Sequence, residues 1–307
     1  MKIAVIGPGS MGLLYASGLA QTSEVILLGN NPENINLINQ HGITVQRGES
    51  SCCRKVPAFL NGTYKEPVDL VILFTKAYHT QEALQANQCV IGPHTVILSL
   101  QNGAGHETTM ARFADDKHIL IGTTAQGASR KNPHTIVHSG LGDTSIGAVS
   151  PDNSNVDTFV NVFNQSGFPC IKSDNIRQTV WNKLMINASS SVLSGLLQVK
   201  QGYVATNPHA WAICQQLISE ICLTANAIGC QFSAKEQIDR IYNHLLAAPD
   251  GLTSIYSDIR NGRKTEVDVI SGTVVNVAGQ HNLSVPTEQL MVRMVHALEG
   301  RNAVSKV

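Results

Sequence analysis

A glycine-rich turn near the start of the chain restricts its fold more than any other feature. The apolar run Lys2–Ile6, typical of a buried strand, leads directly into this turn, and helical periodicity follows it. In a strand–turn–helix pattern the first glycine permits a tight turn, the second lets a pyrophosphate approach the backbone, and the third lets the helix pack on the strand. We therefore predict a dinucleotide site at Gly7, Pro8, Gly9, Ser10, Met11 and Gly12.

Three further apolar runs indicate that the turn belongs to a parallel sheet. These runs are Glu24–Leu28, Val68–Phe74 and Thr95–Leu100. The second is nearly continuous in its apolar character, as expected of a parallel strand that is buried on both faces. Strands that alternate with helices in this way predict an α/β fold with a Rossmann-type dinucleotide-binding domain.

The residues after these runs are the next candidates for cofactor contacts, because ligands lie beyond the carboxyl ends of the strands in an open parallel sheet. Asn30 stands where an acidic residue would select NAD and an arginine would accommodate the 2'-phosphate of NADP. Lys76 is placed to meet a phosphate, and a plain surface lysine is the alternative. Asn102 is expected near the nicotinamide end of the crevice, and an ordinary Asn–Gly turn is the alternative there.

The chain continues with short elements that complete this first domain. Antiparallel strands are expected at Ile119–Ala128, Thr135–His138 and Thr144–Ala148. A helix over Asn155–Gly167 and a strand over Phe168–Lys172 follow. His134 and His138 are four apart, but no cysteine or carboxylate at suitable spacing completes a metal site, so no metal is predicted.

A chain of 307 residues exceeds the size at which one hydrophobic core usually suffices, so two domains are expected. We place the boundary in the linker that begins at Ser173, with a dinucleotide-binding domain at residues 1–173 and a second domain at residues 174–307. The second half shows helical periodicity at Trp211–Ile228, Ala234–Ala248 and Thr265–Gly279. An all-helical domain is predicted there, and the cleft between the domains is the expected substrate site.

A lysine in an apolar helix is the first candidate for catalysis. The segment from Trp181 to Ser191 is predicted to be helical, and Lys183, Asn187 and Ser191, four apart, form one polar stripe on it. A lysine that snorkels above the helix surface is the alternative. Because burial disfavours the charged ammonium, a lysine in such surroundings can donate and recover a proton near neutral pH.

The helical half also offers Ser254 and, twelve residues further on, the segment that contains Glu266. A glutamate that reaches into a cleft beside a lysine could hydrogen-bond a substrate hydroxyl. A solvated glutamate at a helix start is the alternative, since acidic residues are enriched in first turns. The residue pattern alone leaves both readings of Glu266 open.

Composition excludes several classes of protein. The chain has 22 basic and 22 acidic side chains, so nothing indicates a polyanionic partner such as nucleic acid. The first apolar run ends at Gly7, too early for a signal peptide, and no later run approaches 18 apolar residues, so we expect no membrane segment. A soluble, cytoplasmic protein is predicted.

Together these motifs resemble the ketopantoate reductase (2-dehydropantoate 2-reductase) family over almost the whole chain. The resemblance implies NADPH-dependent reduction of 2-dehydropantoate to (R)-pantoate, in the synthesis of pantothenate and coenzyme A. It is also compatible with a homodimer. The motifs that carry it are Gly7-Pro8-Gly9-Ser10-Met11-Gly12, Thr75-Lys76-Ala77, Gln101-Asn102-Gly103, Trp181-x-Lys183-Leu184-x-x-Asn187, Ser254-x-x-x-Asp258, Arg263-x-Thr265-Glu266-Val267-Asp268-x-x-x-Gly272 and Val285-Pro286.

The resemblance also implies roles for individual residues. Lys183 is the implied general acid and Glu266 the group that holds the nascent hydroxyl. Asn187 and Ser254 are implied substrate ligands, and Asn102 is implied to link cofactor and lysine. Ser191, a further candidate substrate contact, stands where family members commonly have an asparagine.

Asn30 is the second departure from the family, whose members commonly have an arginine there. The residue at this position affects the choice between NADPH and NADH, whereas Ser191 affects the shape of the substrate pocket. Two other functions are therefore weighed: a reductase of another small 2-oxo acid on the same scaffold, and a nicotinamide-binding regulator without catalysis. The joint presence of Lys183, Asn187, Ser254 and Glu266 argues against the regulator.

Overall fold

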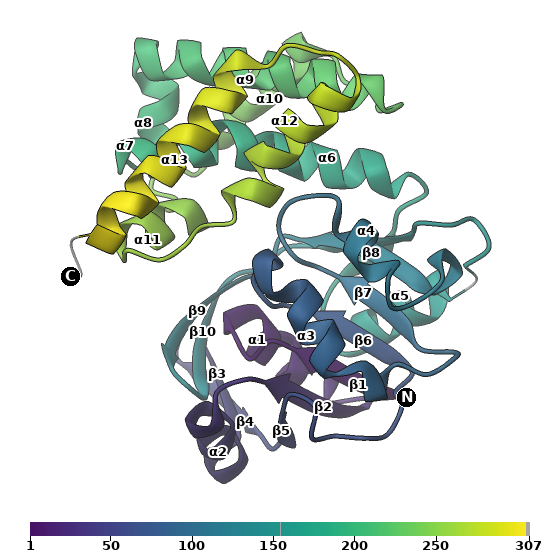
Figure 1. Cartoon of the computed structure of the whole chain (residues 1–307). Coiled ribbons are helices and arrows are strands. Elements are labelled where there is room, and N and C mark those ends of the chain that lie inside the picture. Colours follow the sequence, from purple (N-terminus) through teal and green to yellow (C-terminus); the bar gives the residue numbers. More distant parts are fainter. Residues whose placement is uncertain (154, 305–307) are drawn as a thin grey trace. The chain divides into compact units, whose positions relative to one another are not determined.

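The computed structural model describes residues 1–153 and 155–304 and divides into two compact units. The first is an α/β unit formed by Met1–Gln101 and His106–Thr179, and the second is a helical unit formed by Asn102–Gly105 and the chain from Val180 onward. Figure 1 labels their elements. The predicted fold class is confirmed, and the domain boundary after residue 173 stays a prediction.

The main sheet of the α/β unit carries the predicted glycine turn. In the described residues it has eight strands, in the order β12-β11-β8-β7-β6-β1-β2-β5, and β11 runs antiparallel to β8 while the other neighbours are parallel. The turn after β1 and the ends of β2 and β6 therefore lie at one edge of the sheet. The strands are β1 (Lys2–Ile6), β2 (Glu24–Gly29), β5 (Ala58–Leu60), β6 (Leu70–Leu73), β7 (Val96–Ser99), β8 (Ile119–Thr124), β11 (Thr144–Ala148) and β12 (Cys170–Lys172).

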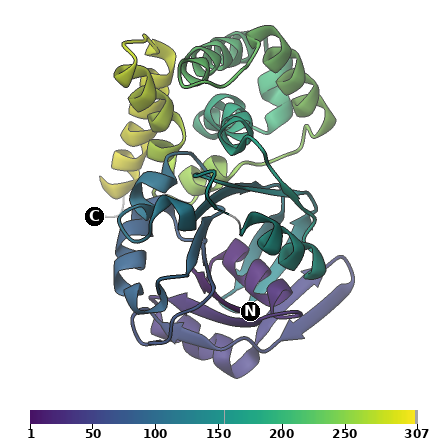
Figure 2. The ribbon, with the colours of Figure 1, turned by 90° about the vertical axis from the view of Figure 1, so that its right-hand side faces the viewer.

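Helices cover both faces of this sheet (Figure 2). Successive residues of a strand point to opposite faces, so Ile3 packs in one core with Phe163 while Ala4 packs in the other with Leu84. The α-helices are α1 (Ser10–Leu19), α2 (Pro32–His41), α3 (Thr80–Ala86), α4 (His106–Met110) and α5 (Val156–Gln165). Single 3₁₀ turns are η1 (Ala77–His79), η2 (Gln88–Val90) and η3 (Asp116–His118).

A second sheet differs from the expected set of antiparallel closing strands. Its order in the described chain is β4-β3-β10-β9, and β10 runs parallel to β3. The sequence pattern missed β3 and β4 because most of their side chains are at least partly exposed and polar. The strands are β3 (Ile43–Arg47), β4 (Ser50–Arg54), β9 (Gly127–Asn132) and β10 (Thr135–Gly140).

The second unit is built from helices, and its main part begins at Val180, within α6. No helix in the described ranges is both long and apolar enough to span a bilayer. The elements are α6 (Ile176–Ile186), the π-helical turn η4 (Asn187–Ser191), α7 (Val192–Leu197), α8 (Gln201–Thr206), α9 (Pro208–Ala227), α10 (Ala234–Ala247), α11 (Ser254–Arg260), the 3₁₀ turn η5 (Val267–Val269), α12 (Ser271–Gln280) and α13 (Pro286–Val304).

Two predictions about these helices need correction. The regular helix expected through Ser191 widens into a π turn at Asn187, where the Ser189 hydroxyl donates to the Met185 carbonyl at 2.5 Å. Hydroxyls that bond back to the preceding turn perturb the helix ladder, and π turns are frequent at functional sites. The expected helix start at Thr265 is also wrong, because α12 begins only at Ser271.

A buried glutamate lies at the start of α13. Glu220 of α9 accepts the backbone N–H groups of Thr287 and Glu288, at 3.0 and 2.9 Å, and so caps this helix. The Glu288 side chain is fully buried. Burial raises the pKa of Glu288 well above the usual range of a carboxyl, the Ser271 hydroxyl opposes this rise, and the charge of Glu220 adds to it.

We expect Glu288→Gln to stabilise the protein at pH 8 and to have little effect at pH 5. The unfolded carboxyl ionises above its ordinary pKa while the folded one keeps its proton, so wild-type stability falls by up to about 1.4 kcal/mol per pH unit until the raised pKa is passed. Glutamine has no proton to lose. Thermal unfolding at both pH values checks this, with Glu236→Gln on the exposed first turn of α10 as control. An equal shift at both pH values would contradict it.

Candidate active site

The glycine turn has the geometry that its sequence predicts. Gly7 adopts φ +106°, and a Cβ atom there would lie 2.7 Å from the backbone nitrogen of Thr75. A side chain at Gly12 would collide with the carbonyl oxygen of Gly7, so close packing of α1 on the turn needs glycine at both positions. The turn thus brings the N-terminus of α1 against the ends of β1 and β6.

Gly9 faces open space, unlike the other two glycines of the turn. A Cβ atom there would meet nothing within 4 Å in the described structure. No described side chain caps α1, so the first N–H groups of this ten-residue helix remain available to an anion. This arrangement fits the pyrophosphate of a dinucleotide.

The end of β2 supports the same site. Gly29 packs so closely on the turn that a Cβ atom would lie 2.6 Å from Cγ of Pro8. Asn30 follows and is exposed, while Asn31 caps α2 by accepting the N–H of Asn34 at 2.9 Å. The position that meets the adenosine ribose in Rossmann domains is therefore held by a neutral, accessible side chain.

Gln101 is a residue whose role the sequence analysis missed. Its Nε2 donates to the Thr75 carbonyl at 2.7 Å and to Thr80 Oγ1 at 2.8 Å, and its Oε1 accepts from Ser99 Oγ at 3.0 Å. It therefore joins the ends of β6 and β7 and fixes the backbone just before Lys76, which is partly buried. The available signal was a polar residue directly after a buried strand.

Within the helical unit, Lys183 contacts a residue far away in sequence. Its Nζ donates to Oδ1 of Asn102 at 3.1 Å. The short loop that carries Asn102 belongs to this unit because the N–H of Ala104 donates to the Val269 carbonyl at 3.1 Å, and Thr273 Oγ1 donates to the Ala104 carbonyl at 3.2 Å. Asn102 is therefore more than an ordinary turn residue.

The electrostatics of Lys183 suit proton donation. Burial lowers the pKa of Lys183 from 10.5 to about 8, and the negative charge of Glu266 acts in the opposite direction. A general acid works best when its pKa lies near the pH at which it operates. The structure thus supports the prediction that this lysine is more than a snorkelling surface residue.

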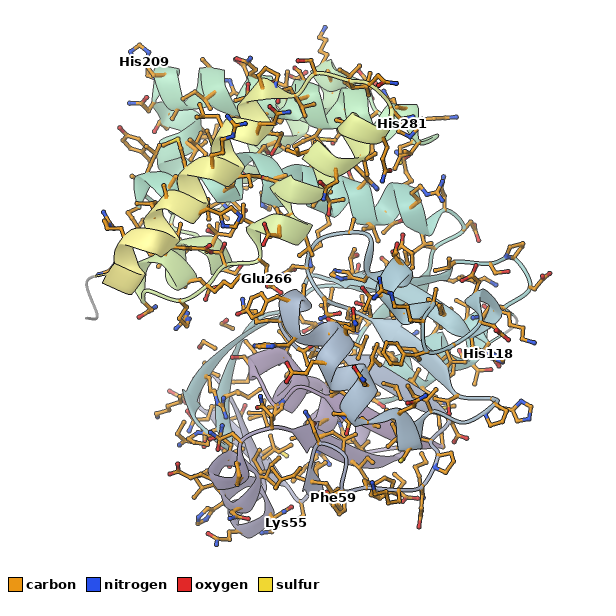
Figure 3. The ribbon with its side chains drawn as sticks, in the orientation of Figure 1. Lys55, Phe59, His118, His209, Glu266 and His281 are labelled. Atoms are coloured by element: carbon orange, nitrogen blue, oxygen red, sulfur yellow. The ribbon has the colours of Figure 1, made fainter. Side chains whose placement is uncertain are left out.

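Glu266 is buried, with only 8% of its surface exposed, and it comes just before the 3₁₀ turn η5 (Figure 3). It is therefore not a solvated glutamate in the first turn of an α-helix, which was the alternative in the sequence. Its charge acts on Lys183, so Asn102, Lys183 and Glu266 converge from three distant parts of the sequence.

Two serines named as candidate substrate contacts are also brought together. Thr253 caps α11 by accepting the N–H of Tyr256 at 3.1 Å, and its hydroxyl donates to the Ser191 carbonyl at 3.4 Å. Ser254, the next residue, is exposed, whereas Ser191 is buried. Asn187 is partly buried at the other end of the π turn.

Gln201 is a second residue that the sequence analysis did not find. Its Nε2 donates to Ser191 Oγ at 3.4 Å, and its Oε1 is buried without a hydrogen-bond partner in the described chain. A glutamine that precedes a glycine gives no signal of this in the sequence. Its polar atoms add to the hydrogen-bonding capacity beside Ser191.

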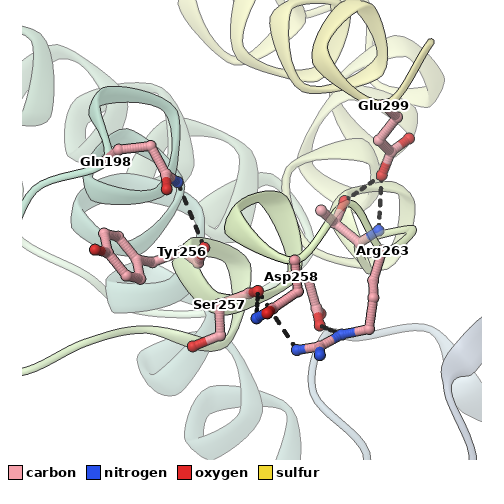
Figure 4. A network of polar contacts seen from close by, with 8 residues as sticks. Gln198, Tyr256, Ser257, Asp258, Arg263 and Glu299 are labelled. Atoms are coloured by element: carbon pink, nitrogen blue, oxygen red, sulfur yellow. Dashed lines mark hydrogen bonds and ion pairs between the residues drawn. The ribbon is translucent and has the colours of Figure 1, made fainter. Parts of the chain in front are cut away.

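The segment before Glu266 is held by an ion pair and by hydrogen bonds to a carboxylate (Figure 4). The Arg263 guanidinium donates from Nε to Asp258 Oδ1 at 2.9 Å, and Asp258 is almost completely buried. Glu299 accepts both the N–H and the hydroxyl of Thr265, at 2.7 and 2.8 Å. The backbone on the N-terminal side of Glu266 is therefore fixed on α11 and α13.

The histidine pair considered as a metal site has other contacts. His138 Nε2 lies 2.7 Å from Gln126 Oε1, and the ring of His134 stacks on that of His41. In the described residues no three His, Cys, Asp or Glu side chains gather as a metal site would require.

A glycine turn of Rossmann type fits a nicotinamide dinucleotide, and a lysine with a lowered pKa is one of the side chains that can protonate a carbonyl oxygen. Fold and site thus define an oxidoreductase with a Rossmann-type NAD(P)-binding domain. The model described as "Ketopantoate reductase PanE/ApbA" matches residues 3–151, and the model described as "Ketopantoate reductase PanE/ApbA C terminal" matches residues 175–299. The chain belongs to the ketopantoate reductase family, which confirms the resemblance seen in its motifs.

Individual relatives extend this similarity over the whole chain. The 2-dehydropantoate 2-reductase of Pyrococcus abyssi is 30% identical, over 98% of this chain and 100% of the relative. That of Streptococcus pyogenes serotype M6 is 26% identical, over 98% of each. D-Mandelate dehydrogenase, solved with NADH and anilino(oxo)acetate, superimposes with a TM-score of 0.94 at 27% identity, covering 99% of this chain and 100% of that one. Related scaffolds therefore act on other substrates.

Proposed function

We propose that the protein is an NADPH-dependent 2-dehydropantoate 2-reductase that forms (R)-pantoate. The observation that carries this proposal is the group formed by Lys183, Asn102 and Glu266 in the helical unit. Its lysine has a pKa close to neutral, as carbonyl protonation needs. Whole-chain similarity to 2-dehydropantoate 2-reductases supports the choice of substrate.

The residues of the chain divide the work as follows. A bound nicotinamide supplies the hydride for the ketone carbon. Lys183 hydrogen-bonds the carbonyl oxygen and transfers its Nζ proton to the developing alkoxide, and Asn102 orients the lysine through the bond at 3.1 Å. Glu266 accepts a hydrogen bond from the nascent hydroxyl.

The remaining site residues bind and position. Asn187, Ser191 and Ser254 hold the polar groups of the 2-oxo acid. The cofactor is held by the turn from Gly7 to Gly12, by Asn30 and Lys76 beside it, and by Asn102 at the nicotinamide end. The open space at Gly9 and the free N–H groups of α1 support this assignment.

A second candidate is a reductase of another 2-oxo acid. The observation in its favour is the close superposition on D-mandelate dehydrogenase, which acts on an aromatic hydroxy acid. Ser191, which is shorter than the asparagine common at this position in the family, is also consistent with a substrate of different shape. The lowered pKa of Lys183 argues against a regulator without catalysis, because a protein that only binds the cofactor does not need a proton donor.

A turnover assay separates these functions. Purified protein is given NADPH or NADH with ketopantoate or with phenylglyoxylate, the 2-oxo acid that corresponds to mandelate. We expect the highest kcat/KM with NADPH and ketopantoate. Preference for phenylglyoxylate would establish the second candidate, and absence of turnover with every 2-oxo acid would favour the regulator.

We also expect a modest preference for NADPH over NADH. Asn30 brings no negative charge against a 2'-phosphate, and Lys76 supplies one positive charge without the planar fork of an arginine. Asn30→Arg should increase the preference, and Lys76→Ala should reduce it by up to about fivefold, less at high salt. The ratio of kcat/KM for the two cofactors measures this. Equal use of both by wild type and Lys76→Ala would show that Lys76 does not contact the phosphate.

A further inference from the structure

The segment that carries Glu266 is fastened on both sides to α13. On one side, Glu299 Oε1 accepts the N–H and the hydroxyl of Thr265, at 2.7 and 2.8 Å (Figure 4). On the other side, Nε2 of His296 lies 2.8 Å from Oδ1 of Asp268. Thr265 and Asp268 stand one residue before and two residues after Glu266. We call Thr265, Asp268, His296 and Glu299 the Glu266 clamp.

His296 joins the two halves of the clamp. Its Nδ1 lies 2.9 Å from Oε2 of Glu299, while its Nε2 contacts Asp268. Ionised carboxylate oxygens only accept hydrogen bonds, and a neutral imidazole has only one N–H to give. Two carboxylates on opposite ring nitrogens are therefore both satisfied only by the doubly protonated imidazolium. The clamp is complete only when His296 carries a positive charge.

We infer that His296 and Glu299 are positioning residues that hold the Glu266 carboxylate in its working place, and that deprotonation of His296 loosens this hold. The inference rests on the proposed role of Glu266. The segment 265–270 begins no α-helix of its own, since α12 starts at Ser271, so its conformation depends on contacts from outside. Small displacements of such a catalytic group lower turnover strongly.

The charges around His296 support this dependence on pH. The hydrogen bond to Glu299 raises the pKa of His296 above the usual range of a histidine, Asp268 acts in the same sense, and partial burial opposes both. Among the elements packed on α13, η5 contributes Asp268, and α7 and α12 contain no ionisable side chain. α9 contributes Glu220, which caps the opposite end of α13, and His209 in its own first turn, while α13 itself carries Glu288, Arg293 and Arg301 besides the clamp residues.

The sign of the effect follows from the raised pKa. A group with a raised pKa in the folded state contributes fully at low pH, and its contribution disappears as the pH rises through the folded-state value. The clamp is therefore complete below the folded-state pKa of His296, which lies above the usual range of a histidine, and it is lost as the pH rises through that pKa. Since Lys183 loses its proton near pH 8, two separate groups weaken activity at high pH.

A double-mutant cycle tests whether His296 acts through Glu266. We expect His296→Gln to lower kcat/KM for the 2-oxo acid about tenfold in the wild-type background and less than twofold in the Glu266→Gln background, because coupled residues give non-additive effects. His281→Gln, at an exposed position after α12 (Figure 3), should change neither. The same factor in both backgrounds would overturn the inference.

Nuclear magnetic resonance of ¹⁵N-histidine and ¹³C-glutamate samples provides a readout without turnover. We expect the titration midpoint of the His296 ring, assigned with His296→Gln, to lie above the ordinary histidine value and to fall in Glu299→Gln. The carboxyl signal of Glu266, assigned with Glu266→Gln, should move when His296 is replaced. A His296 midpoint at or below the ordinary histidine value, or a Glu266 signal that does not respond to the replacement of His296, would overturn the clamp.

The two experiments keep the proposals apart. Lack of turnover with every 2-oxo acid would overturn the proposed function, and the resonance data would still decide whether the clamp exists. Normal turnover combined with an additive cycle would leave the proposed function standing and reject the clamp.

Discussion

Lys183→Ala should lower kcat by roughly 10²- to 10⁴-fold, the usual range for the loss of a general acid. Burial has lowered the pKa of this lysine to about 8, so the wild-type side chain can give its proton to the alkoxide at neutral pH, and alanine has none to give. Binding of NADPH should change little, because the predicted phosphate contacts lie in the glycine turn. Steady-state kinetics and cofactor fluorescence measure the two quantities.

Lys183→Arg is the matched control for charge. Arginine keeps the positive charge but does not lose its proton in proteins, so it should restore little turnover. In the wild type, kcat/KM should fall above about pH 8 as the ammonium of Lys183 loses its proton. Near-normal turnover in Lys183→Ala would remove the lysine from the mechanism.

Glu266→Gln should lower kcat/KM by about tenfold, because the neutral amide oxygen of glutamine accepts a weaker hydrogen bond from the nascent hydroxyl than a carboxylate does. The variant keeps the size of the side chain, so the thermal midpoint should remain close to wild type. Because the charge of Glu266 raises the pKa of Lys183, the alkaline fall in activity should also move to lower pH.

Glu236→Gln, which replaces an exposed glutamate at the start of α10, is the control for removing one negative charge. It should leave kcat/KM and its pH dependence unchanged. If Glu266→Gln destabilised the fold while its kinetics stayed normal, Glu266 would serve the structure of the segment before α12 and would have no part in catalysis.

The nucleotide-binding end of the molecule could be predicted from the sequence. The turn from Gly7 to Gly12 is a local feature, and the collisions that a Cβ atom at Gly7 or Gly12 would cause depend on backbone close by. Strands such as Val68–Phe74 are recognisable because burial on both faces requires a continuous apolar run. The roles of Asn30 and Lys76 stay predictions.

The helical half was predicted less completely. The periodicity identified its main helices. The π turn at Asn187 involves a hydrogen bond from a serine hydroxyl to a backbone carbonyl, and the spacing of apolar residues does not predict such a bond. α12 begins only at Ser271, and Thr265, where the helix was expected to begin, donates its backbone N–H and its hydroxyl to the Glu299 carboxylate. Sequence order placed Asn102 after a strand, and its contacts group it with the helices.

Local patterns in the chain were enough to predict the class of fold, the family and the residue types that the chemistry needs, because strand and helix periods, glycine turns and motif spacing are local properties of a chain. Which side chains lie next to one another became known only from the packing of the folded protein. Asn102, Lys183 and Glu266 converge although more than 80 residues separate each from the next. The burial of Glu266, the lowered pKa of the lysine and the contacts of His296 arise from that packing, which no single segment encodes.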